Sequence, residues 1–171
     1  MKSRKVTITL FIFYLLALAG IILFKTKLAF SFLHYQFTFV MDVQRSINLI
    51  PFGAMLKLNG APSYNEIIYN GLAFVPFGIF ICMLKNKRSF GSLIVPIVLT
   101  SLFFEADQYI FALGASDITD VIANTLGGIA GIGIFFVFHK ICKDNVYRVL
   151  NITALVLEIV LAVFVGLIIV L

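Results

Sequence analysis

The chain has 171 residues, of which 61% are hydrophobic and 12% are charged. Average soluble chains are about 45–50% apolar and about 25% charged, so this composition excludes both a soluble domain and a disordered chain. The net charge of +5 does not indicate nucleic-acid binding, because the basic residues stand at the ends of apolar segments, where membrane topology places them. We therefore expect an all-α integral membrane protein that forms a single domain over residues 1–171.

The chain contains five apolar segments, each long enough for the roughly 20 residues that a membrane-spanning helix needs. The first segment continues past a triplet that resembles a signal-peptide cleavage site, so we interpret it as an uncleaved span. Residues 45–52, which contain the helix-stopping Pro51, are interpreted as an interfacial or re-entrant turn. The predicted spans are residues 6–24, 66–84, 90–110, 120–138 and 149–171.

The basic residues predict how this bundle is oriented. The positive-inside rule favours a cytoplasmic N-terminus and an outside C-terminus, although Lys25 and Lys27 count against this arrangement. Cys82 and Cys142 then lie near the reducing inner face, so no disulfide is expected. Nine of the thirteen lysines and arginines fall on the inner side, namely Lys2, Arg4, Lys5, Lys85, Lys87, Arg88, Lys140, Lys143 and Arg148.

Polar side chains mark the outer ends of the second, third and fourth predicted spans. They recur at helical spacing, so those of each span share one face, and the helical rise of about 1.5 Å per residue places them at similar depth. A carboxylate in hydrocarbon costs about 2.5–3.5 kcal/mol at the helix centre, so it should face the bundle interior. We predict an outward-opening polar pocket around Glu105, formed with Asn48, Asn70, Gln108, Asp117, Asp120 and Asn124. The amides of Asn70 and Asn124 are expected to donate hydrogen bonds to Glu105.

A clamp between helices that binds no ligand is the alternative interpretation of these polar residues, with each bond worth about 0.6–2 kcal/mol. Gly127, Gly128 and Gly131 permit close helix packing, and we do not interpret them as a phosphate loop because no strand precedes them. No Cys/His cluster is present in the sequence, so we expect neither a metal site nor a cofactor. Glu158, in the middle of the fifth span, is interpreted as having a structural partner.

Four motifs follow one another over residues 48–131. They are Asn-Leu-Ile-Pro-Phe from residue 48, Asn-Gly-Leu-Ala-Phe-Val-Pro-Phe-Gly from 70, Glu-x-x-Gln from 105, and Asp-Ile-Thr-Asp-Val-Ile-Ala-Asn-Thr-Leu-Gly-Gly from 117. Together they resemble the VanZ-like family of bacterial membrane proteins. The resemblance implies a multi-pass protein of a bacterial cell membrane, in a family whose namesake is linked to low-level resistance to the glycopeptide teicoplanin.

The chain departs from this family pattern at one place. Many members carry an arginine shortly before the first aspartate of the last motif, where this chain has Gly114-Ala115-Ser116. If that arginine binds an anionic group in other members, this chain differs in its ligand. Arg45 and Lys57 are the candidate replacements.

The residues and the resemblance leave three functions open. We favour a non-enzymatic envelope protein that contacts membrane lipids and binds an outer-leaflet amphiphile. The amphiphile is either a lipid-linked wall precursor or an acylated glycopeptide. The second is an intramembrane enzyme acting on a lipid head group, with a desolvated Glu105 as general acid or base. It lacks an evident nucleophile–base pair, so no catalytic residue is assigned. The third is a small-molecule or ion transporter, which would need a homo-oligomer because five helices are few for a monomeric carrier.

Overall fold

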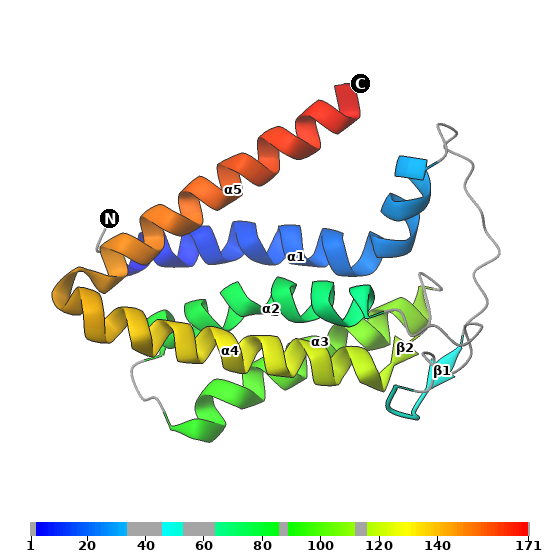
Figure 1. The fold of residues 1–171 in the computed structure, drawn as a ribbon, viewed down its shortest axis with the longest axis horizontal. Coiled ribbons are helices and arrows are strands. Elements are labelled where there is room, and N and C mark those ends of the chain that lie inside the picture. Colours follow the sequence, from blue (N-terminus) through cyan, green and yellow to red (C-terminus); the bar gives the residue numbers. More distant parts are fainter. Residues whose placement is uncertain (1–2, 34–45, 53–63, 86–88, 112–115, 171) are drawn as a thin grey trace.

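The computed structural model describes residues 3–33, 46–52, 64–85, 89–111 and 116–170. These residues are mostly helical, as predicted (Figure 1). Two short strands, β1 (Ile47–Asn48) and β2 (Ser116–Asp117), form a parallel pair, and a 3₁₀ turn, η2 (Lys143–Asn145), precedes the last helix. The α-helices are α1 (Arg4–Leu33), α2 (Asn65–Leu84), α3 (Phe90–Ile110), α4 (Ile118–Cys142) and α5 (Val146–Val170).

Four stretches of the described chain are long and apolar enough to cross a membrane. The predicted count of five differs because the last stretch, Ile118–Leu167, contains both α4 and α5. The turn η2 separates these helices, and each has 25 residues. The helix α1 extends past the predicted span end at residue 24, since no proline or glycine between there and Leu33 stops it.

Successive helices α1 to α4 run in opposite directions, so their polar ends meet at one end of the bundle (Figure 1). This end holds the starts of α2 and α4, the end of α3, and the strands β1 and β2, and we call it the polar end. The carboxylates of Glu66, Glu105, Asp107, Asp117 and Asp120 belong to these elements. The opposite end carries basic residues, including Arg4, Lys5, Lys85, Lys140, Lys143 and Arg148.

Helices α2 and α4 approach each other through glycines. A Cβ atom placed on Gly127 would overlap the backbone of Gly71, and one on Gly78 would overlap the carbonyl of Gly128. One turn further along α4, a Cβ on Gly131 would overlap the Val75 carbonyl. Glycine is the residue that allows such backbone contact between membrane helices. This contact brings the first turns of α2 close to the first turns of α4, where the polar residues of both helices lie.

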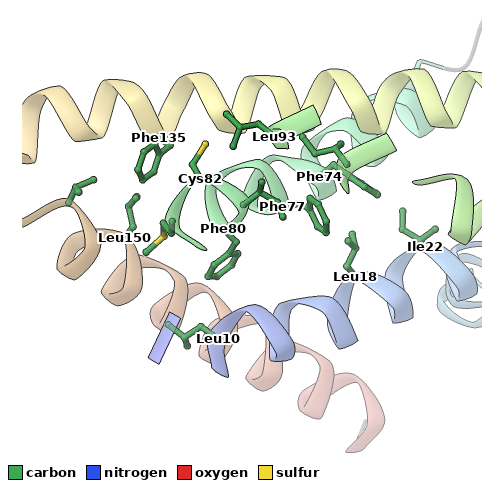
Figure 2. Close-up of a cluster of buried hydrophobic side chains, with 14 of the residues drawn as sticks. Leu10, Leu18, Ile22, Phe74, Phe77, Phe80, Cys82, Leu93, Phe135 and Leu150 are labelled. Carbon is green, nitrogen blue, oxygen red and sulfur yellow. The ribbon is translucent and has the colours of Figure 1, made fainter. Parts of the chain in front are cut away.

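An apolar cluster fills the space between the helices. Figure 2 shows labelled members from every α-helix, including Leu18 of α1, Leu93 of α3, Phe135 of α4 and Leu150 of α5, around the phenylalanines of α2. The outward faces are also apolar, and in α3 Leu99 is 60% exposed. Large exposed apolar surfaces of this kind indicate contact with a partner or with lipid.

Helix α5 is attached to the bundle near its start and diverges from α1 toward its C-terminal end (Figure 1). At the attached part, the buried side chains of Thr7 and Asn151 are hydrogen-bonded to each other at 3.1 Å. Elsewhere on α1, the Tyr14 hydroxyl donates to the Ala73 carbonyl of α2 at 2.7 Å. These contacts connect α1 to α5 and to α2.

Candidate functional site: a hydrogen-bonded cluster at the polar end

Asp117 connects three elements at the polar end. Its backbone N–H donates to Oε2 of Glu105 in α3 at 2.8 Å. Its Oδ2 atom accepts from Nδ2 of Asn48 in β1 at 2.9 Å, and its Oδ1 accepts from the Thr119 backbone N–H at 2.8 Å. Two of the predicted site residues, Asn48 and Glu105, therefore both contact a third, Asp117.

The bond between Asp117 and Thr119 is an N-cap of α4. Aspartate is among the favoured N-cap residues, because its carboxylate satisfies a backbone N–H that the first helical turn leaves without a partner. Asp120 adds a second carboxylate to this turn and is only 4% exposed. Both carboxylates lie where the helix macrodipole favours negative charge.

Residues 46–52, which we call the finger, are fastened to the start of α4. The backbone N–H of Ser116 donates to the Ser46 carbonyl at 3.0 Å, and Asn48 lies opposite Asp117 in the strand pair. The Phe52 N–H donates to Oγ1 of Thr119 at 2.9 Å. A turn at Pro51 and Phe52 is present, as the sequence predicted, but the pairing with β2 and the role of Thr119 were not predicted.

Asn124 and Gln108 are buried and form bonds that the sequence did not predict. Asn124 Nδ2 donates to Oγ of the buried Ser101 at 2.8 Å, and Gln108 Nε2 donates to the Ile22 carbonyl of α1 at 2.8 Å. The predicted bond from Asn70 to Glu105 is wrong, because Asn70 Nδ2 has no hydrogen-bond partner among the described residues. Glu105 instead accepts the Asp117 N–H, a backbone donor at the start of the strand–helix junction.

Three buried amides of this cluster have side-chain atoms with no hydrogen-bond partner in the described part of the chain. These atoms are Asn70 Nδ2, Gln108 Oε1 and Asn124 Oδ1, and the residues are at most 4% exposed. Most buried polar atoms in proteins are paired, and each unpaired one costs about 1–3 kcal/mol. These residues lie on α2, α3 and α4 toward the polar end, and their unpaired atoms are one donor and two acceptors, which are chemically able to bind a polar group.

Within the described residues, no group of three His, Cys, Asp or Glu side chains is placed to hold a metal ion. Arg45, Lys57, Gly114 and Ala115 lie outside the described residues. Glu158 lies on α5, and its Oε1 atom has no hydrogen-bond partner in the part of the chain that the structure describes.

The cluster belongs to the region that known proteins share with this chain. A family model described as VanZ/LLP1 matches residues 11–139. The chain belongs to the VanZ-like family. Protein VanZ of Enterococcus faecium is 34% identical over 153 residues, which cover 88% of this chain and 87% of that protein. The resemblance identified from the motifs is confirmed, and no solved structure matches the chain.

Proposed function

We propose that this VanZ-like protein is a multi-pass protein of the bacterial cell membrane that binds the head group of an outer-leaflet amphiphile at its polar end. Through this binding the protein contributes to low-level glycopeptide resistance, and teicoplanin is the glycopeptide with which we test it. The N-terminus lies in the cytoplasm and the C-terminus outside. The basic residues at the end opposite the cluster support this orientation by the positive-inside rule.

The observation that carries the proposal is the set of partnerless buried amide atoms on Asn70, Gln108 and Asn124. A clamp that served only to hold the helices together would pair these atoms with one another, because an unpaired polar group is costly in an apolar interior. Atoms left open on three residues of α2, α3 and α4 suit a polar group supplied from outside the chain.

The charges of the cluster indicate what such a head group contains. Glu105 and Asp120 are buried carboxylates, and the two open amide oxygens also accept hydrogen bonds. Acceptors therefore outnumber the open donor on Asn70, so the cluster suits hydroxyl or amino groups. Lipid-linked wall precursors and the acylated glycopeptide teicoplanin both combine such groups with a chain that partitions into lipid. Vancomycin, which has no acyl chain, is the matched comparison.

Binding to purified protein in lipid nanodiscs tests this proposal. We expect teicoplanin to bind wild-type discs above empty discs, and Glu105→Gln to weaken binding about tenfold or more, since a change of about 1.4 kcal/mol is tenfold. Glutamine keeps an acceptor for the Asp117 N–H, so the variant removes charge without removing the contact. The exposed Glu66, at the same end, supplies the control Glu66→Gln. Equal teicoplanin affinity for wild type and Glu105→Gln would contradict a site at this cluster.

A further inference from the structure

The finger carries several large apolar side chains on the surface of the protein. Ile47, Leu49, Ile50 and Phe52 are all exposed, and Leu49 and Ile50 reach 74% and 68%. Such side chains gain free energy by leaving water, roughly in proportion to the apolar area removed. In the described structure no other part of the chain covers them, so they face the surroundings of the protein.

Contacts with the start of α4 hold the backbone of the finger in place. Phe52 has φ of 60°, in the left-handed region that bulky residues rarely adopt. Such conformations persist when the surrounding structure fixes them, and they occur at functional positions. Here the fixing contacts are the bond from Phe52 to Thr119, the bond from Asn48 to Asp117, and the strand pair. The finger is therefore held in a fixed position against the start of α4.

Three exposed tyrosines indicate that the finger lies near the membrane–water interface. Tyr64 precedes α2, Tyr69 lies in its first turns, and Tyr109 lies in the last turn of α3, so all three belong to the polar end. Tyrosine is enriched where a membrane meets water, because its ring suits the acyl boundary and its hydroxyl suits the head groups. The finger is attached to the same end of the bundle (Figure 1).

We infer that the finger inserts its apolar side chains into the head-group boundary of the outer leaflet. It is an interfacial anchor that Asp117 connects directly to Glu105 of the polar cluster. The anchor holds the polar cluster at the membrane depth where the head group of an amphiphile lies. This inference rests on the membrane orientation in the proposed function and not on ligand binding.

Tryptophan fluorescence tests the anchor, since the natural chain contains no tryptophan. Phe52→Trp and, as a second variant at a more exposed position, Leu49→Trp would each provide a sole emitter. The variants are placed in phosphatidylcholine vesicles whose lipid is brominated either near the acyl carbonyl or near the chain end. We expect blue-shifted emission that is quenched more by the shallow bromines than by the deep ones. Acrylamide in the water should quench it weakly.

The control is Leu99→Trp, at an exposed position near the middle of α3. Its emission should be quenched mostly by the deep bromines. Water-like emission from both finger variants, quenched by acrylamide and unaffected by bromolipid, would overturn the anchor while leaving membrane placement intact. Failure of the Leu99→Trp control to respond to either lipid would overturn the membrane placement itself, and the anchor with it.

Discussion

Replacing Gly127 with alanine is expected to destabilise the fold strongly, whereas the same replacement at Gly133 is expected to leave it intact. The new methyl group at Gly127 would overlap the Cα, carbonyl carbon and oxygen of Gly71. Backbone atoms cannot rotate out of the way as a side chain can, so α2 and α4 must separate. Overpacking of this kind costs about 1–3 kcal/mol and occasionally more. At Gly133 nothing lies within 4 Å of the added atom.

Folded protein that survives heating in mild detergent, measured by size-exclusion chromatography, provides the readout. Both replacements are Gly→Ala on α4 and share the gain in helix propensity of about 1 kcal/mol, so their difference isolates the helix contact. Equal heat resistance of the two variants would show that the close approach of α2 and α4 does not support the fold.

Replacing Asn70 with leucine is expected to separate stability from function. Asn70 Nδ2 is buried without a hydrogen-bond partner in the described chain, so an apolar side chain of similar size should leave stability unchanged or raise it. If the amide serves a bound head group, teicoplanin binding and protection should both be lost. A clamp without a ligand predicts no functional loss.

Asn151→Leu is the matched control for this prediction. Its amide is paired with Thr7, so leucine there leaves a buried hydroxyl without that partner and should lower stability by about 1–3 kcal/mol. Protection at equal amounts of folded protein should remain. For Asn70→Leu we expect heat resistance in detergent to be kept and protection against teicoplanin to be lost. For Asn151→Leu we expect lower heat resistance and retained protection. Full protection by Asn70→Leu would remove Asn70 from the site.

The sequence was informative where periodicity and apolar length decide the structure. The segments at 66–84 and 90–110 correspond to α2 and α3, and their polar residues meet at one end as the helical spacing indicated. The break predicted between the spans 120–138 and 149–171 is also present, because η2 at Lys143–Asn145 lies in that interval. The extension of α1 to Leu33 follows from the absence of a helix-stopping proline or glycine, and no residue there positively marks a helix.

Contacts between distant residues were beyond the sequence alone. The pairing of Asn48 with Asp117 joins strands of two residues each, too short to produce an alternating pattern. Spacing does not determine side-chain direction, so it could not show that Asn124 pairs with Ser101 while Asn70 Nδ2 has no partner in the described chain. A local signal was available for one missed residue. The run Asp117-Ile118-Thr119 fits an aspartate N-cap, which places Thr119 in the first turn of α4 beside the finger.

We propose that protection against an acylated glycopeptide needs the charge of Glu105 at the polar end. The most direct measurement is teicoplanin and vancomycin susceptibility in cells that express wild type or Glu105→Gln at matched levels. We expect wild type to lower susceptibility to teicoplanin only, and Glu105→Gln to abolish the shift. Wild-type protection by Glu105→Gln, or no shift for either drug with wild type, would contradict it.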